Sequence, residues 1–164
     1  MTRDGHEITL HGNIEFPKEV LTCLENGATG IGLYRTEFLY LDREEDPTEE
    51  DHYQAYAAAL EMLGGRPITI RTCDLGADKF TRRHGEAAER NPFLGLRSIR
   101  YSLQHVDLFK TQLRAILRAS ALGPVRILFP LVTNLRELRH ARTILNDVRE
   151  DLEEERVAFD RHIK

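Results

Sequence analysis

The sequence contains few cysteines, no long apolar segment and no excess of positive charge, and each absence narrows the possible functions. Its 2 cysteines in 164 residues, Cys23 and Cys73, form no CxxC pair. A zinc site or a disulfide framework is therefore not expected, and a reducing, cytoplasmic setting fits. No apolar run approaches the ~20 residues that cross a bilayer, and the N-terminus MTRDGHEITL lacks a signal sequence, so membrane insertion is not expected. The net charge of −4 gives no electrostatic reason to expect a nucleic-acid partner.

Glycine-rich phosphate loops are also missing. Neither a GxGxxG motif nor a Walker loop is present, which argues against dinucleotide and nucleotide-triphosphate binding. The composition is that of a globular protein, with 41% hydrophobic and 30% charged residues. The length suits one domain with a core and is too short for two ordinary domains.

Strand-like and helix-like segments alternate along the chain. Strands are predicted at residues 8–14, 30–34, 67–73 and 125–132, and helices at 17–26, 48–63, 95–105, from 107 to about 122, and from 134 onward. This alternation predicts an α/β fold with a parallel sheet covered by helices, either a doubly wound sheet or a barrel. A complete (β/α)8 barrel needs about 250 residues, so four strands would form only half of one.

Local patterns make these elements specific. Thr48 with Asp51, and Asn134 with Glu137, are spaced as helix N-terminal caps, and Asp107 is a third candidate cap. The segment VRILFPLV at 125–132 is apolar almost throughout, as expected of a strand buried on both faces. The last helix shows an apolar stripe of Leu135, Leu138, Ala141, Leu145, Val148 and Leu152.

Three arginines lie where strands end or the next element begins. Arg35 closes the second strand, Arg71 nearly closes the third, and Arg97 follows a long polar stretch from Asp74 to about Pro92. In parallel α/β folds the carboxyl ends of the strands form the ligand site, and guanidinium groups bind phosphate or carboxylate in a bidentate manner. We expect Arg35, Arg71 and Arg97 to converge at this end of the sheet and face one open pocket. The plainer alternative is that each arginine pairs with a nearby acid such as Glu37 or Asp74.

Four segments together resemble a known family. GIGLYRTEFLYL, ITIRTCDLGADK, NPFLGLRSIR and LRAILRASALGPVRILFPLV are similar to the phosphoenolpyruvate-binding domain of the phosphoenolpyruvate-protein phosphotransferase family, enzyme I of the bacterial sugar phosphotransferase system. Pyruvate phosphate dikinase and phosphoenolpyruvate synthase are similar in this region. The resemblance covers nearly the whole chain and implies the first half, about four strand-helix units, of a (β/α)8 TIM barrel.

The resemblance implies roles for particular residues. Arg35 and Arg71 are expected to hold the phosphate of phosphoenolpyruvate, and Arg97 to line the same site. Asp74, Asp78 and Lys79 belong to a DxGxDK-like stretch that is expected to order the adjoining loop. No catalytic residue is assigned. The seven histidines lie outside the family's phosphorylation motif and are expected to have surface or packing roles.

The resemblance also implies what residues 1–164 do not supply. The family's Mg²⁺ ligands, its proton-donating cysteine and its phosphorylated histidine have no match in this sequence. We therefore expect the domain to be truncated before the fifth strand of a larger enzyme, and to bind phosphoenolpyruvate weakly without turning it over. In the intact relative, the phosphoryl group passes to a histidine and then to a histidine-containing phosphocarrier protein, and a homodimer is expected. The alternative is a non-catalytic half-barrel with an assembly or regulatory role.

Overall fold

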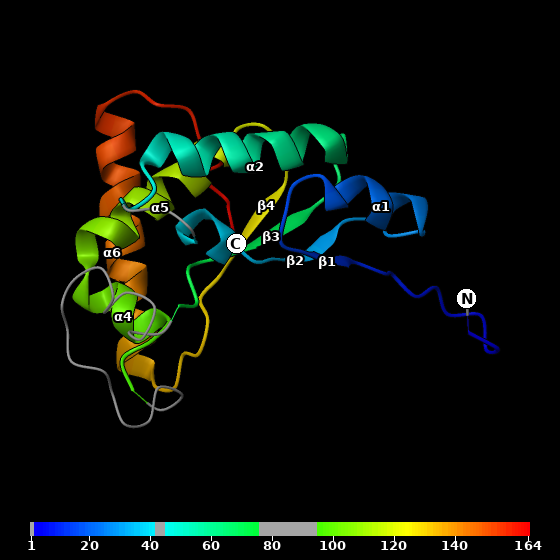
Figure 1. The fold of residues 1–164 in the computed structure, drawn as a ribbon, viewed down its shortest axis with the longest axis horizontal. Coiled ribbons are helices and arrows are strands. Elements are labelled where there is room, and N and C mark those ends of the chain that lie inside the picture. Colours follow the sequence, from blue (N-terminus) through cyan, green and yellow to red (C-terminus); the bar gives the residue numbers. More distant parts are fainter. Residues whose placement is uncertain (1, 42–44, 76–94) are drawn as a thin grey trace.

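A computed structural model describes residues 2–41, 45–75 and 95–164 of the chain. The strands are β1 (Gly12–Ile14), β2 (Ile31–Tyr34), β3 (Ile68–Arg71) and β4 (Val125–Leu128). The helices are α1 (Glu19–Glu25), the 3-10 helix η1 (Glu37–Tyr40), α2 (Glu49–Leu63), α4 (Ile99–Gln104), α5 (Val106–Ser120) and α6 (Leu135–Glu154). Figure 1 shows these elements in chain order.

The four strands form one parallel sheet in the order β1-β2-β3-β4. This order confirms the predicted α/β architecture with neighbouring strands in chain order. Gly30 precedes β2, and a Cβ atom there would lie 2.6 Å from the carbonyl oxygen of Pro67. The absence of a side chain thus allows the segments that lead into β2 and β3 to approach each other closely.

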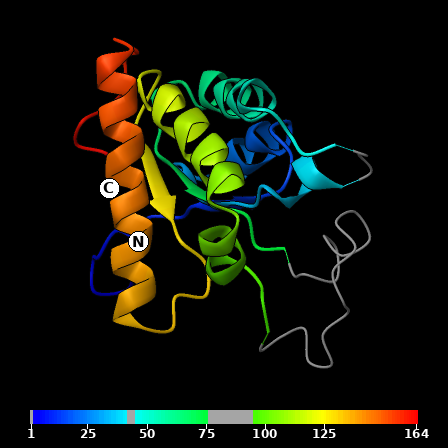
Figure 2. The same cartoon turned by 90° about the vertical axis from the view of Figure 1, so that its left-hand side faces the viewer.

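The helices form a layer along the sheet. Helix α1 contacts α2, α2 contacts α5, and α5 contacts α6, as the two perpendicular views show (Figures 1 and 2). Right-handed crossovers between parallel strands in sequential order place all helices on the same side, which explains this layer. Its inner surface carries Tyr56, Leu63, Leu113, Ile116 and Val148, each with no exposed surface.

Two predicted helix caps are confirmed. The Thr48 side chain accepts a bond from the backbone N–H of Asp51, and Asn134 accepts bonds from Arg136 and Glu137. In both helices the acidic residue bonds back to the N–H of the cap residue, which completes a capping box. These bonds are local in sequence, and they hold the starts of α2 and α6.

Several predicted boundaries are wrong. β1 begins at Gly12 rather than residue 8, because the chain before it is exposed, with Ile8 and Leu10 both 58% exposed. β4 ends at Leu128, whose carbonyl accepts the N–H of Thr72. Beyond it Leu131 has a positive φ of 52° and is 46% exposed. Within 125–132 only Val125 and Pro130 are buried, and Arg126 is exposed, so the expected burial on both faces is wrong for most of the segment.

The helical predictions need three corrections. α4 begins at Ile99 rather than residue 95, after Ser98 with φ 52°. α5 begins at Val106, so Asp107 lies in its first turn and is not its cap. The negative charge of Asp107 still interacts favourably with the positive end of the helix dipole. In α6, Leu135 is 57% exposed and Leu138 is 36% exposed, whereas Ile144 is buried.

No helix in the described ranges is both long and apolar enough to span a bilayer.

The last residue of the chain lies beside β4, where the N–H of Ile127 donates to the carbonyl of Lys164 at 2.8 Å. The outer edge of β4 therefore already receives one backbone partner from outside β3.

Candidate functional site

The predicted arginines lie at the C-terminal ends of adjacent strands. Arg35 directly follows β2, and its N–H bonds the carbonyl of Ile14 at 2.9 Å, which extends the pairing of β1 with β2. Arg71 is the last residue of β3. Arg97 lies shortly before α4, where the N–H of Ser98 bonds the carbonyl of Leu75 at 3.1 Å. The sheet thus places Arg35 and Arg71 at its same end, and backbone pairing brings the Arg97 segment to the chain after β3.

Arg71 and Arg97 share one carboxylate. Arg71 Nη1 lies 3.2 Å from Asp74 Oδ2, and Arg97 Nη2 lies 3.2 Å from Asp74 Oδ1. Ser98 Oγ also donates to Asp74 Oδ1. Both arginine side chains are largely covered, at 19% and 20% exposure. Asp74 therefore joins two of the three predicted arginines into one cluster.

A second carboxylate orients Arg71. Glu37, the first residue of η1, accepts from Arg71 Nη2 at 3.1 Å and from the backbone N–H of Asp74 at 2.9 Å. The guanidinium group is thus held between Glu37 and Asp74. Pairs of this kind, largely shielded from solvent, restrict the side chain to one orientation.

Arg35 has a different partner. Its Nη2 lies 3.2 Å from Glu15 Oε2, directly after β1, and its side chain is 42% exposed. Each of the three arginines therefore pairs with a nearby acid, as the plainer alternative predicts. Glu15 as the partner of Arg35 was not among the acids that the sequence suggested. That Arg35 faces the same open pocket as Arg71 and Arg97 stays a prediction.

The carboxylates do not use all the donors of Arg71 and Arg35. A guanidinium group carries five N–H groups, and Arg71 donates one to Glu37 and forms an ion pair with Asp74. The Nε atoms of Arg71 and Arg35 are buried and have no hydrogen-bond partner within the described part of the chain. Buried polar groups normally have a partner, so these N–H groups are suited to donate to a bound anion.

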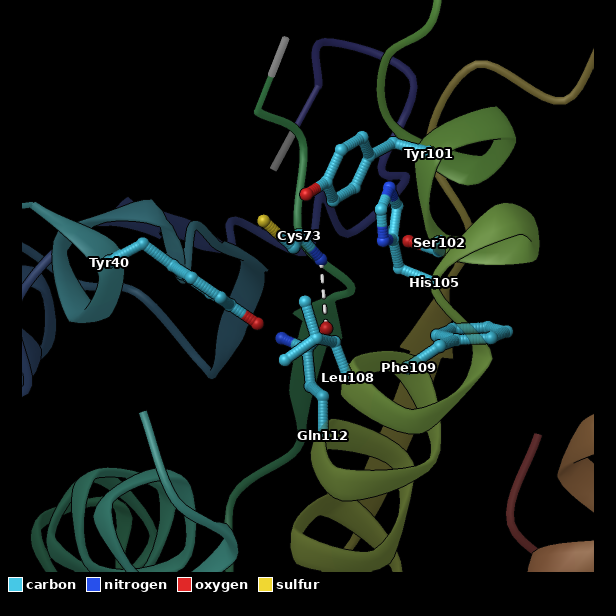
Figure 3. A pocket seen from close by; sticks show the side chains of 8 residues that line it. All are labelled: Tyr40, Cys73, Tyr101, Ser102, His105, Leu108, Phe109 and Gln112. Carbon is cyan, nitrogen blue, oxygen red and sulfur yellow. Dashed lines mark hydrogen bonds between the residues drawn. The ribbon is translucent and has the colours of Figure 1, made fainter. Parts of the chain in front are cut away.

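A pocket lies beside the arginine cluster, between the chain after β3 and helices α4 and α5 (Figure 3). It is lined by Tyr40, Cys73, Tyr101, Ser102, His105, Leu108, Phe109 and Gln112. The volume open to the centre of a water molecule is about 10 Å³. This is enough for one water molecule and too small for a phosphorylated metabolite. Burial raises the pKa of the Cys73 thiol far above its ordinary value, so it is no ready nucleophile.

The described residues offer no ready set of metal ligands. Among them, no group of three or more histidine, cysteine, aspartate or glutamate side chains is placed to hold a metal ion. Glu37 and Asp74, the two acids of the arginine cluster, form ion pairs with Arg71 and Arg97. Asp78 and Lys79, predicted to order the loop beside the site, lie outside the described residues.

Sequence reasoning missed one central residue. Gln112, on α5, is 1% exposed and bonds the backbone of Cys73 and the side chain of Thr36. A glutamine between Phe109 and Leu113 on the apolar face of a helix is the pattern that would have revealed it.

Comparison with known proteins identifies the family. The family model described as "PEP-utilising enzyme, PEP-binding domain" matches residues 1–164. A phosphoenolpyruvate-protein phosphotransferase of Latilactobacillus sakei is 49% identical over 147 residues, which is 90% of this chain and 26% of that protein. One of Priestia megaterium is 44% identical over 164 residues, 100% of this chain and 29% of that protein.

The chain therefore spans between 26% and 29% of the length of these two relatives. The sequence identity to these relatives extends over at least 90% of the chain whose fold is described above. The chain belongs to the family of PEP-utilising enzymes and carries sequence of their PEP-binding domain.

Proposed function

We propose that this chain supplies phosphate-binding arginines of a phosphoenolpyruvate-dependent protein phosphotransferase. The observation that carries the proposal is Arg71, which is fixed by Glu37 and Asp74 at the end of β3 and has a buried Nε–H without a partner among the described residues. A phosphate oxygen is the acceptor best suited to such a fork of donors. The names of the relatives favour this function over the dikinase and synthase alternatives.

The charge balance defines how an anion would bind. Three guanidinium groups, of Arg35, Arg71 and Arg97, face three carboxylates, of Glu15, Glu37 and Asp74. These six groups sum to zero charge, so they attract anions little over a long range. Recognition would depend on directed N–H donors at short range, which selects for the geometry of the ligand rather than for its charge alone.

In phosphoryl transfer these arginines would stabilise the charge on the phosphoryl oxygens. Transition states of this reaction carry their charge on those oxygens, and fixed donors stabilise it without reorganisation. Since Glu37 and Asp74 already hold Arg71, little side-chain ordering would be needed at the moment of reaction. We propose that the phosphoryl group passes to a histidine and on to a histidine-containing phosphocarrier protein, as the resemblance implies.

Other parts of the proposal concern the setting. Mg²⁺ is proposed as the metal of the whole enzyme, but the described residues do not provide its ligands, so no step here involves it. A homodimer is proposed for the whole enzyme from the resemblance alone. Both cysteines are free, which supports the proposed cytoplasmic location.

Calorimetric titration of the 164-residue chain with phosphoenolpyruvate tests the proposal. We expect weak binding that Arg71→Ala removes. Arg126→Ala is the matched control, because Arg126 lies exposed on the neighbouring strand β4. Binding that survives in Arg71→Ala, or that is lost equally in both variants, would contradict the proposal.

A further inference from the structure

A chain of buried hydrogen bonds lies beneath the arginine cluster and converges on Gln112. This side chain extends from α5 to the backbone after β3 (Figure 3). Its Oε1 accepts the N–H of Cys73 at 2.9 Å, and its Nε2 lies 3.0 Å from Thr36 Oγ1 and 3.1 Å from the Tyr56 hydroxyl. One glutamine therefore contacts the segment after β3, the segment after β2, and α2.

The direction of these bonds is fixed by a backbone group. The N–H of Cys73 can only donate, so the atom of Gln112 that faces it must be the carbonyl oxygen. The amide nitrogen then donates to Thr36 Oγ1 and to the Tyr56 hydroxyl. Thr36 donates its own proton to the carbonyl of Arg71 at 3.0 Å, because a carbonyl oxygen can only accept.

The contacts extend through α2 to η1. The Tyr56 hydroxyl accepts from Gln112 and lies 3.0 Å from His52 Nδ1. His52 Nε2 in turn lies 3.3 Å from the Tyr40 hydroxyl. Burial raises the pKa of both phenols well above the ordinary value, so they keep their protons. His52 is 1% exposed and lies between the two phenols, so Tyr56, His52 and Tyr40 form one buried series of contacts from α2 to η1.

We infer that Gln112 is the positioning residue that sets the Arg35 segment and the Arg71 segment relative to each other. It reaches the Arg35 segment twice, through Thr36 and through Tyr56, His52 and Tyr40. It reaches the Arg71 segment through Cys73 and through the Thr36 bond to Arg71. As a role in substrate binding, this inference rests on the proposed function.

The contacts distinguish this role from that of an ordinary buried amide. Such a group needs only to satisfy its own donors and acceptor. Here the partners of Gln112 among the described residues, Cys73, Thr36 and Tyr56, belong to the two segments that carry the arginines and to the helix that anchors one of them. Loss of the amide should therefore change the placement of Arg71 as well as the stability of the core.

Three variants of the 164-residue chain test the inference by calorimetry with phosphoenolpyruvate. Gln112→Leu removes every bond at nearly constant volume, and we expect the Kd to rise roughly tenfold, as for loss of one net hydrogen bond of the usual strength. Thr36→Val removes only the Thr36 branch and should also raise the Kd. Leu113→Ala, in the next position on α5, destabilises the core without touching the chain of bonds, and its Kd should stay within about twofold of the original.

Nitrogen NMR of the ligand-free protein gives a readout that general destabilisation does not move. In the unsubstituted chain and in Leu113→Ala, the His52 ring nitrogens should give the same chemical shifts. In Gln112→Leu the Tyr56 hydroxyl loses its bond from Gln112, so the His52 nitrogen shifts and the Arg71 Nε–H resonance should both change. Thr36→Val should shift the Arg71 resonance and leave the His52 nitrogen shifts unchanged.

The outcomes separate the two proposals. If the unsubstituted chain binds phosphoenolpyruvate and Gln112→Leu binds it equally well, the inference is overturned while the proposed function stands. If the unsubstituted chain does not bind, the proposed function fails, and the NMR signals decide on Gln112 alone. Identical Arg71 and His52 signals in Gln112→Leu and the unsubstituted chain overturn the positioning role. If Gln112→Leu fails to fold, Thr36→Val decides by the same two measurements.

Discussion

At Arg71 the shape of the side chain matters as much as its charge. The guanidinium group donates to Glu37 with one terminal nitrogen, at 3.1 Å, and forms an ion pair with Asp74 through the other, at 3.2 Å. Its Nε–H has no acceptor among the described residues. An ammonium group is a point charge on a flexible chain and cannot reproduce this planar arrangement. Charge at this position is therefore expected to be insufficient for binding.

Arg71→Lys should weaken phosphoenolpyruvate binding by roughly tenfold or more, the equivalent of losing one charge-assisted hydrogen bond. The measurement is a titration of the chain followed by calorimetry or by amide NMR shifts. Arg126→Lys, on the exposed face of β4, serves as the control and should bind as before. Equal affinity of Arg71→Lys and the unsubstituted chain would show that charge alone suffices.

The sequence predicts some residue contacts better than others. Arg71 and Asp74 are three positions apart, so their ion pair follows from local geometry. The Arg35–Glu15 pair joins residues twenty positions apart, and it depends on the β1–β2 register, which shifts between Gly12 and Asn13. Gln112 and Cys73 are 39 positions apart. Their contact depends on how α5 packs behind β3, which periodicity does not specify.

At the scale of elements, boundaries set by local chemistry are predicted and those set by packing are not. The caps at Thr48 and Asn134 involve residues within three or four positions, and both are confirmed. The break between α4 and α5 at His105 lies within one or two residues of the predicted one. The start of α4 is different: it lies at Ile99 rather than residue 95, after Ser98, whose N–H bonds the carbonyl of Leu75, a contact that forms only in the folded chain.

The cap of α6 gives a prediction for acid stability. The N–H of Thr133 is the main cause that lowers the pKa of Glu137 below its ordinary value of 4.5, and the N–H of Asn134 adds to it. The unfolded glutamate therefore binds a proton at higher pH than the folded one. The stabilisation is complete above this ordinary value and is lost as the pH falls through the folded pKa.

Glu137→Gln should accordingly flatten the decline of the unfolding free energy below about pH 4.5. Urea unfolding of the variant and the unsubstituted chain across this pH range measures the difference. Glu154→Gln, exposed at the other end of α6, is the control on the same helix. The same acid dependence in Glu137→Gln and the unsubstituted chain would exclude the cap as its source.

At the scale of the whole molecule, one core unites the sheet with its helical layer. Buried residues from every strand and from α1, α2, α4, α5 and α6 belong to a single cluster. The fold class follows from the alternation of strands and helices, since a parallel sheet needs such crossovers. The extent of β1 and β4 does not follow, because it depends on which neighbours cover their edges.

Cys73 lies within this core and should report its opening. The side chain is 8% exposed, and burial raises the pKa of its thiol well above the ordinary value. In a Cys23→Ser variant, iodoacetamide should label Cys73 slowly in the native chain and faster with denaturant, in parallel with unfolding. Native labelling of Cys73 at the rate of a free thiol would show that the core opens locally.

A chimera tests whether the chain works as part of a transferase or as a non-catalytic module. It replaces the matching region of the Latilactobacillus sakei relative, which shares 49% identity over 147 residues. Core volume and register should be compatible at this identity, because cores tolerate substitutions that preserve volume and pattern. We expect the chimera to form pyruvate from phosphoenolpyruvate in the presence of the phosphocarrier protein. In the chimera, Arg71→Ala should lower the rate by roughly a hundredfold or more, as for loss of a preorganised donor, whereas Arg126→Ala should not. A folded chimera that forms no pyruvate would favour the non-catalytic alternative.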